Sequence, residues 1–182
     1  WFADYDTNLQ QEGSPLYVDG VLYISTAWSK VYAFDARTGR KLWQYNPKVP
    51  GQWAVNVCCG LVNRGIAAYD GKIYVGTLDG RLVAVDARTG KEVWSVNTID
   101  KNWRYSITGA PRIVKGNVVI GNSAPSSACA ATSLPMTRVQ ASSPGAFIPC
   151  RVTRPRVRKV LHPTAPCRWL QRPGRASGGT TA

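Results

Sequence analysis

The strongest constraint on the fold is a repeat in the sequence. The stretch AFDARTGRKLW at residues 33–43 returns as AVDARTGKEVW at residues 84–94, an offset of 51 residues. A hairpin-like segment precedes each copy, VDGVLYIST and YDGKIYVGT, and a third segment of this kind, VKGNVVIGNS, comes later. Periods near 50 residues are typical of proteins built from stacked structural repeats, propellers among them. The sequence therefore predicts similar units that pack side by side.

Each unit has the pattern of antiparallel β-structure. GVLYIST and GKIYVGT alternate and are rich in β-branched and aromatic residues, KVYAFDA and RLVAVDA follow after a short turn, and KLWQY and EVWSV come next. Gly39 and Gly90 end the RTG turns between them, where glycine accepts a positive φ. Three to four antiparallel strands per unit are typical of a propeller blade. We predict an all-β fold, a partial β-propeller of about two to three blades, in which Trp43 and Trp94 pack between blades.

Charge and proline content change abruptly after Ser123. Residues 1–123 hold 14 Lys and Arg against 10 Asp and Glu, a net charge of +4, whereas residues 124–182 hold 9 Lys and Arg and no acid, a net charge of +9. Of the 12 prolines, 4 precede residue 124 and 8 follow it. We therefore predict propeller blades at 1–123 and a basic, largely disordered tail at 124–182, with no strand pattern in 124–142. No run of about 18 apolar residues occurs, so we expect no transmembrane segment.

Two cysteines, Cys58 and Cys59, stand next to each other in NVCCGLVNRG. Neighbouring Cα atoms lie about 3.8 Å apart, whereas ordinary disulfides span about 4.4 to 6.8 Å, so a bond between the two would close a strained ring. Strain of this kind persists where a functional site uses it. The alternative is a pair of buried free thiols, and the two residues by themselves leave both interpretations open.

The repeat and the cysteine pair together resemble one protein family. The pattern Ala-x-Asp-x-x-Thr-Gly-x-x-x-Trp resembles the tryptophan-docking motif of pyrroloquinoline quinone (PQQ) dehydrogenases, whose fold is an eight-bladed propeller of four-stranded blades. NVCCGLVNRG is more specific, because it resembles the vicinal-disulfide segment of methanol dehydrogenases and quinohaemoprotein alcohol dehydrogenases. NLQQEGSPLYVDGVLYISTAWSKVYAFDA is similar to the latter group. The resemblance spans residues 1–123.

This resemblance implies a set of cofactor-binding residues. Cys58 and Cys59 match the disulfide that covers one face of the quinone ring. Glu12 matches the acidic residue that hydrogen-bonds the cofactor, and Arg64 matches the arginine that contacts the quinone oxygens. PQQ is a planar, acidic ortho-quinone, for which a fixed guanidinium is a suitable donor.

Two further positions belong to the implied cofactor site. Thr108, in SITGAPR, matches a threonine that holds a cofactor carboxylate, and Ser123, in VIGNS, matches the first residue of the next cofactor-binding loop. The calcium-binding glutamate of the family is expected three residues later, but position 126 is Ser126. The aspartate base belongs to a part of the family's propeller that this chain lacks, so we assign no catalytic and no metal-ligating residue here.

The resemblance also implies the activity. Members of the family are periplasmic, bind PQQ and calcium, oxidise alcohols to aldehydes by hydride transfer to the quinone, and pass electrons to a c-type cytochrome. The chain does not begin with Met, and we expect it to be an inactive fragment of such an enzyme. It contains no Cys-x-x-Cys-His, so we expect no c-type haem to attach to this chain. Whether the full-length parent has a haem domain is left open by the sequence. The alternative is a non-enzymatic propeller scaffold with similar repeats.

The break after Ser123 suggests a shifted reading frame. Codons permitted for residues 124–137, with one base restored in front, encode Gly-Ala-Glu-Phe-Gly-Val-Arg-Gly-Tyr-Val-Thr-Ala-Tyr-Asp, which resembles the family's calcium-ligand loop and the strand that follows it. We therefore hypothesise a one-base deletion after the Ser123 codon. The alternative is a functional tail that binds nucleic acid or anionic lipid, but RVTRPRVRK matches no binding module, and we expect no nucleic-acid partner.

Overall fold

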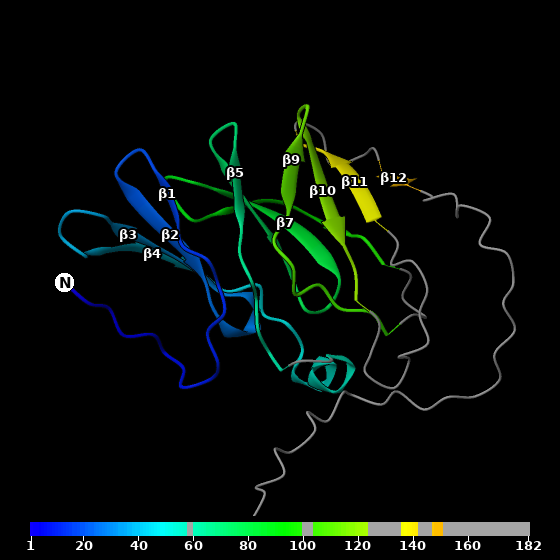
Figure 1. Ribbon diagram of the computed structural model, residues 1–182, viewed down its shortest axis with the longest axis horizontal. Helices are drawn as coiled ribbons and strands as arrows, with labels where there is room; N and C mark the ends of the chain where they lie inside the picture. Colours follow the sequence, from blue (N-terminus) through cyan, green and yellow to red (C-terminus); the bar gives the residue numbers. More distant parts are fainter. Residues whose placement is uncertain (58–59, 100–103, 124–135, 142–146, 151–182) are drawn as a thin grey trace, which may run out of the picture.

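The computed structural model describes residues 1–57, 60–99, 104–123, 136–141 and 147–150. Within these residues the chain forms three four-stranded antiparallel sheets, which lie side by side in sequence order (Figure 1). We call them blades 1, 2 and 3. The prediction of an all-β fold with about two to three propeller blades is confirmed.

Blades 1 and 2 have the same construction. Blade 1 contains β1 (Leu16–Val18), β2 (Val21–Ser25), β3 (Val31–Asp35) and β4 (Lys41–Tyr45). Blade 2 contains β5 (Ala67–Tyr69), β6 (Lys72–Gly76), β7 (Arg81–Asp86) and β8 (Glu92–Asn97). In both blades each strand pairs with the next one in the chain. The register shifts after Ala33 in blade 1 and after Ala84 in blade 2, so the repeat preserves even the irregularity of the sheet.

Blade 3 extends beyond Ser123, where we expected no strands. It contains β9 (Arg112–Val114), β10 (Asn117–Gly121), β11 (Met136–Gln140) and β12 (Phe147–Cys150). The expectation that 124–142 has no strand pattern was wrong for β11. The free edge of β10 supplies its pairing, so tertiary contact rather than local composition makes this strand. The division into two parts at Ser123 stays a prediction, because residues 151–182 lie outside the described residues.

Two short 3₁₀ helices lie in the loops between strands. η1 (Ala27–Ser29) joins β2 to β3, and η2 (Gly51–Asn56) lies between β4 and β5. In Figure 1, η2 lies at the end of the blades opposite the tips of the β1–β2, β5–β6 and β9–β10 hairpins. The molecule therefore has a hairpin end and a loop end, and the longer connections gather at the loop end.

Blade 2 is buried on both faces, and each face forms a separate core. Alternate residues of β6 and β7 pack on blade 1, in a core of Tyr23, Val31, Ala33, Tyr45, Ile66, Ile73, Val75, Val83 and Val85. The residues between them pack on blade 3, in a core of Tyr74, Leu82, Ala84, Trp94, Ile107, Val118, Ile120, Val139 and Ala141. Burial on both sides explains why RLVAVDA has a nearly continuous apolar run instead of strict alternation.

Tryptophans join one blade to the next, as the sequence predicts. The indole Nε1 of Trp43 donates a hydrogen bond of 3.0 Å to the carbonyl of Ala87 in the following blade. A Cβ at Gly90, where φ is +72°, would lie 2.7 Å from Cδ2 of Trp43, so the ring rests directly on the glycine backbone. Trp94 is 9% exposed and packs in the core between blades 2 and 3.

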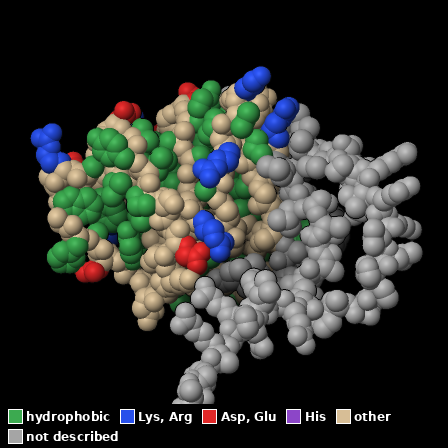
Figure 2. Space-filling view, viewed as in Figure 1, with side chains coloured by type: hydrophobic (Ala, Val, Ile, Leu, Met, Phe, Trp, Pro, Cys, Tyr) green, Lys and Arg blue, Asp and Glu red, His purple; other side chains and the backbone are tan. Residues whose placement is uncertain are grey.

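The first residue repeats this arrangement on blade 1. Trp1 Nε1 donates to the carbonyl of Ala36 at 3.1 Å, and a Cβ at Gly39 would lie 2.5 Å from Cδ2 of Trp1. Tyr5 packs on Phe34, with ring centroids 6.4 Å apart. Figure 2 shows apolar side chains gathered at the surface over blade 1, and Phe2 is 86% exposed. The N-terminal segment thus occupies the place on blade 1 that β4 occupies on blade 2.

Candidate functional site at the loop end of the blades

Three of the predicted cofactor-binding residues occupy equivalent places in the three blades. Glu12 lies four residues before β1, Arg64 three residues before β5 and Thr108 four residues before β9. These strands are the first of each blade, and all three are entered from the loop end. Residues far apart in the sequence therefore meet at the place where the chain enters each blade.

Arg64 is the centre of this meeting point. Its Nη2 lies 3.0 Å from Oε2 of Glu12 in an ion pair, and its Nη1 donates to Oγ1 of Thr108 at 2.8 Å. The side chains of Arg64 and Glu12 are 40% and 28% exposed, and Thr108 is buried. Because each contact comes from a different blade, the direction of the guanidinium depends on the packing of all three.

The backbone of Arg64 is held by the two segments that carry Glu12 and Thr108. Its N–H donates to the carbonyl of Thr108 at 2.9 Å, and its carbonyl accepts from the N–H of Ser14 at 3.3 Å. The next residue, Gly65, has a φ of +150°, and a Cβ there would lie 3.1 Å from Cβ of Ala110. The chain of blade 2 thus passes closely between the entering segments of blades 1 and 3, and a side chain at position 65 would separate them.

Ser123 lies next to the strand-entering segment that carries Thr108. Ser123 and Ser106 form an isolated antiparallel bridge, with backbone hydrogen bonds of 3.0 and 2.8 Å. Oγ of Ser123 also donates to the carbonyl of Ser106 at 3.1 Å. Ser123 therefore belongs to the same loop end as Thr108, although the structure gives no direct contact between Ser123 and Arg64.

The two cysteines, Cys58 and Cys59, lie outside the described residues, so the predicted disulfide stays a prediction. The structure describes the chain on either side of the pair. Trp53 lies in η2 just before the pair, and the carbonyl of Leu61, just after it, accepts from the N–H of Trp28 at 3.0 Å. Trp28 has a φ of +61°, which is rare for a bulky side chain.

The sequence did not single out three residues that support this site. Gln10 donates from Nε2 to Oε1 of Glu12 at 2.6 Å. Ser106 pairs with Ser123, and buried Asn63 accepts at Oδ1 from the N–H of Gly65 at 3.0 Å. An asparagine two residues before a glycine is a signal for a turn in which the side chain accepts a backbone hydrogen bond. The turn at Asn63 could therefore have been predicted from the sequence. The roles of Gln10 and Ser106 depend on partners that only the fold brings near.

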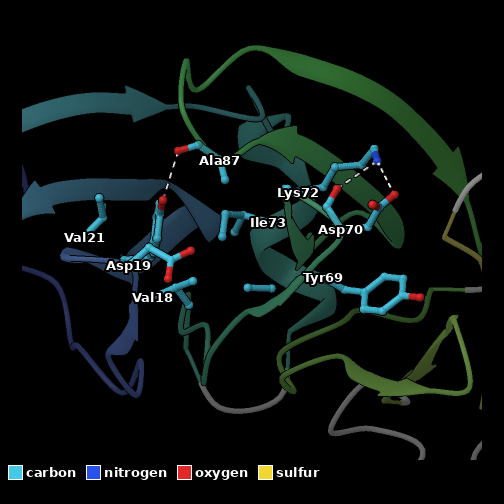
Figure 3. A pocket seen from close by; sticks show the side chains of 11 residues that line it. Val18, Asp19, Val21, Tyr69, Asp70, Lys72, Ile73 and Ala87 are labelled. Carbon is cyan, nitrogen blue, oxygen red and sulfur yellow. Dashed lines mark hydrogen bonds and ion pairs between the residues drawn. The ribbon is translucent and has the colours of Figure 1, made fainter.

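A separate pocket of about 340 Å³ lies at the hairpin end, between blades 1 and 2 (Figure 3). Asp19, Tyr69 and Asp70 line it, and Lys72 pairs with Asp70 at 3.1 Å. Tyr23 donates there to the carbonyl of Ala87 at 3.1 Å. No predicted cofactor-binding residue lines this pocket, and its charged groups are already paired or exposed on hairpin tips, which favours a structural junction.

The loop-end residues suit an acidic, planar quinone. An arginine has five N–H donors. In Arg64, Nη1 contacts Thr108 and Nη2 contacts Glu12, so these two contacts leave further N–H donors for a ligand. The hydroxyl of Thr108 accepts from Arg64 and keeps its own proton for donation. This donor set therefore fits the carboxylates and carbonyl oxygens of PQQ. No three His, Cys, Asp or Glu side chains lie together among the described residues, and the Glu12 carboxylate is already paired with Arg64.

Comparison with known proteins gives a consistent result. The model of the family described as glucose/ethanol/alcohol dehydrogenase, β-propeller domain, matches residues 3–141. The chain is 56% identical over 128 residues to an alcohol dehydrogenase (quinone), dehydrogenase subunit, of Gluconacetobacter polyoxogenes, covering 67% of this chain and 17% of the relative. It is 54% identical over 123 residues to a 1-butanol dehydrogenase (cytochrome c) of Thauera butanivorans, covering 67% and 18%.

A solved structure agrees with these relatives. The quinohaemoprotein alcohol dehydrogenase ADHIIG of Pseudomonas putida HK5 superposes with a TM-score of 0.72 and 46% identity, covering 77% of this chain and 20% of that protein. The chain thus spans less than a fifth of the length of the curated relatives it matches. Among the described residues, no helical segment has the length and apolar character that a membrane span requires.

Proposed function

The chain belongs to the glucose/ethanol/alcohol dehydrogenase β-propeller family, and on that basis we propose that its full-length protein is a PQQ-dependent alcohol dehydrogenase. The observation that carries the proposal is the guanidinium of Arg64, held between Glu12 and Thr108 at the loop end. A scaffold propeller, the other class that the sequence left open, has no need of a cation fixed by three blades.

In this proposal the described residues bind and orient the cofactor. Arg64 would hold the quinone oxygens and Thr108 a carboxylate, while Glu12 would hydrogen-bond the cofactor and keep the guanidinium in place. Bound PQQ would accept the hydride that an alcohol loses on oxidation to an aldehyde. The positive charge of Arg64 next to a quinone oxygen would stabilise the negative charge that develops there. Because the contacts to Glu12 and Thr108 already fix the guanidinium, little reorganisation is needed during the reaction.

The same proposal includes Cys58, Cys59 and Ser123. A disulfide between the adjacent cysteines would offer the quinone a flat and rigid surface, and the strain of such a ring is tolerated where a site uses it. Ser123 would begin the loop that binds the cofactor from blade 3. Support for both comes from position: the pair lies between η2 and the Arg64 turn, and Ser123 pairs with Ser106 beside Thr108.

The remaining parts of the proposal concern the full-length protein. We place it in the periplasm, with calcium beside PQQ, an alcohol as substrate and a c-type cytochrome as electron acceptor. A relative named 1-butanol dehydrogenase (cytochrome c) supports the last two points. No cluster of three His, Cys, Asp or Glu side chains occurs among the described residues, and we assign them no step that requires the metal.

The test is reconstitution of the full-length protein. The apoprotein is incubated with PQQ and calcium chloride, and the reduction of an artificial dye is followed with ethanol and 1-butanol as substrates. We expect alcohol-dependent dye reduction that requires PQQ and saturates near one PQQ per protein. A protein that binds PQQ in no condition and oxidises no alcohol would refute the proposal.

A further inference from the structure

Asn63 is a buried polar residue directly before Arg64, and both polar atoms of its side chain are hydrogen-bonded. It is 1% exposed. Its Nδ2 donates to the carbonyl of Gly76 at 2.8 Å and to Oγ of Ser29 at 3.3 Å. Its Oδ1 accepts from the N–H of Gly65 at 3.0 Å. A satisfied amide in the interior is costly to disturb, because any partner left alone is buried without water.

These partners come from both sides of the boundary between two blades. Ser29 belongs to η1 of blade 1, and Gly76 is the last residue of β6 in blade 2. The third hydrogen bond closes a turn from residue 63 to residue 65, with Arg64 in the middle. The amide of Asn63 thus fixes the backbone on which the guanidinium is mounted, relative to both blades.

The blade 1 partner is held in an unusual conformation. Ser29 and Trp28 have φ values of +56° and +61°, although neither is glycine. The N–H of Trp28 donates to the carbonyl of Leu61, so the η1 loop and the 61–65 loop are joined at two places. Backbone strain of this kind persists where surrounding contacts enforce it, often beside functional sites.

The blade 2 partner also connects Asn63 to Thr108. A Cβ at Gly76 would lie 2.3 Å from Cγ2 of Ile107, so Ile107 packs directly on the glycine that receives the Asn63 hydrogen bond. Ile107 is fully buried and directly precedes Thr108. The backbone that accepts from Asn63 therefore also sets the position of the hydroxyl that contacts Arg64.

We propose that Asn63 is a positioning residue for the cofactor site, which acts by fixing the direction of the Arg64 guanidinium. This inference rests on the proposed function, since it concerns the arginine assigned to PQQ. Asn63 itself needs no contact with the cofactor. Its removal should weaken PQQ binding only while a guanidinium is present to be misplaced.

The test measures PQQ binding rather than activity. The dissociation constant of PQQ is determined by fluorescence titration of the full-length apoprotein with calcium present, for the wild type, Asn63→Ala, Arg64→Lys and the double variant. We expect Asn63→Ala to raise the dissociation constant about tenfold, a typical effect of removing an outer partner of a binding residue. In the Arg64→Lys background the same change should have an effect of about threefold or less, because the two residues act as one unit.

The matched control is Tyr23→Phe. It removes a partly buried hydrogen bond between blades 1 and 2, from the hydroxyl of Tyr23 to the carbonyl of Ala87, at the hairpin end of the molecule. We expect this variant to lower the melting temperature and to leave the dissociation constant of PQQ unchanged. If Asn63→Ala does not fold, Asn63→Asp takes its place, since it keeps the acceptor for Gly65 and loses the donor to Gly76; it should also raise the dissociation constant.

Four outcomes are decisive. If the Asn63 variants bind PQQ with wild-type affinity, the inference is overturned. It is also overturned if Asn63→Ala raises the dissociation constant equally in the wild type and in Arg64→Lys, because Asn63 would then have a structural role only. Failure of the wild type itself to bind PQQ would instead refute the proposed function. Non-additive effects of Asn63→Ala and Arg64→Lys, with Tyr23→Phe unaffected, support the inference.

Discussion

At the scale of single residues, Arg64 shows how a surface-accessible side chain is given one orientation. Both of its backbone polar groups are hydrogen-bonded, and its guanidinium contacts Glu12 and Thr108 from two other blades. Lysine has the same charge but lacks the planar arrangement of donors. The geometry therefore predicts that the site depends on the guanidinium and not on charge alone.

Arg64→Lys in the full-length protein should weaken PQQ binding by about tenfold to a hundredfold, the range expected when a fixed multi-donor contact is replaced by a single mobile ammonium. A PQQ titration measures the effect. The control is Arg81→Lys, because Arg81 also pairs with a carboxylate, that of Asp79 at 2.9 Å, and donates to the carbonyl of Pro47 rather than to a predicted cofactor-binding residue. Equal losses in both variants would contradict the assignment of Arg64.

Asp6 provides a prediction about acid stability. The hydrogen bond from Lys30 is the largest cause that lowers the pKa of Asp6, from 3.8 to about 2, and the hydrogen bond from Tyr32 is the second. A lowered pKa in the folded state stabilises the fold above pH 3.8, and this contribution is lost as the pH falls through about 2. Because the side chain is 48% exposed, we expect only about 1 kcal/mol.

Asp6→Asn should therefore lose less stability than the wild type as the pH falls from about 4 to about 2. Urea unfolding at each pH measures the difference in the free energy of unfolding. Part of the acid sensitivity should remain, since hydrogen bonds in the turns also lower the pKa of Asp35 and Asp86. Parallel curves for the two proteins would show that the Asp6–Lys30 pair contributes nothing.

At the scale of elements, the unit that recurs is a tryptophan resting on the glycine of the next turn. Trp1 and Trp43 each donate to a carbonyl of the following blade. Ala141 takes the equivalent place in blade 3, since its N–H donates to the carbonyl of Gly116. Yet Nε1 of Trp94 is buried and has no hydrogen-bond partner among the described residues. Within the described residues, Trp94 therefore does not make the docking hydrogen bond that Trp1 and Trp43 make.

Gly90→Ala tests this docking contact. The new methyl group would meet Trp43 at 2.7 Å, whereas a methyl group at Gly71, with a similar φ of +67°, would meet nothing within 4 Å. Both variants place alanine in a left-handed conformation, which costs about 1 to 2 kcal/mol. Overpacking should cost Gly90→Ala about 1 to 3 kcal/mol more in the free energy of unfolding. Equal destabilisation in urea would mean that Trp43 shifts without cost.

The limits of sequence-based prediction also appear at this scale. The strands of blades 1 and 2, the turn glycines and the role of Trp43 followed from repetition and periodicity, because these depend on local pattern. Glu12, Arg64 and Thr108 were predicted through family resemblance, and the fold brings the three together. The strand β11 was missed because only tertiary packing brings its partner β10 beside it. Asn63 was missed although its turn with Gly65 is a local signal, because its other partners, Ser29 and Gly76, lie farther away in the sequence.

At the scale of the whole molecule, the blades differ in the burial of their faces and in the residue that stands at the turn after the third strand. Blade 2 is covered on both faces. In blade 3, Gln140 pairs with Asn117, as Asp35 pairs with Val21 and Asp86 with Lys72 in blades 1 and 2. A glutamine has replaced the aspartate that caps the turn by accepting from backbone N–H groups, as Asp35 does. This departure lies downstream of Ser123, where the composition also changes.

The departure supports the hypothesis of a one-base deletion after the Ser123 codon. The prediction is that the neighbouring frame of the parent gene encodes Gly-Ala-Glu and then a strand ending in Ala-Tyr-Asp. Nucleotide sequencing of the gene from its genome decides the point. A neighbouring frame without this stretch would refute the hypothesis and leave residues 124–182 as a genuine part of the protein.

The most direct test of the central claim is the crystal structure of the full-length protein with PQQ bound. We predict the quinone at the loop end of the blades, with a quinone oxygen within hydrogen-bonding distance of Arg64, a carboxylate at Thr108, and a disulfide between Cys58 and Cys59 against one face of the ring. PQQ bound away from Arg64, or free thiols at both cysteines beside the bound ring, would contradict the account.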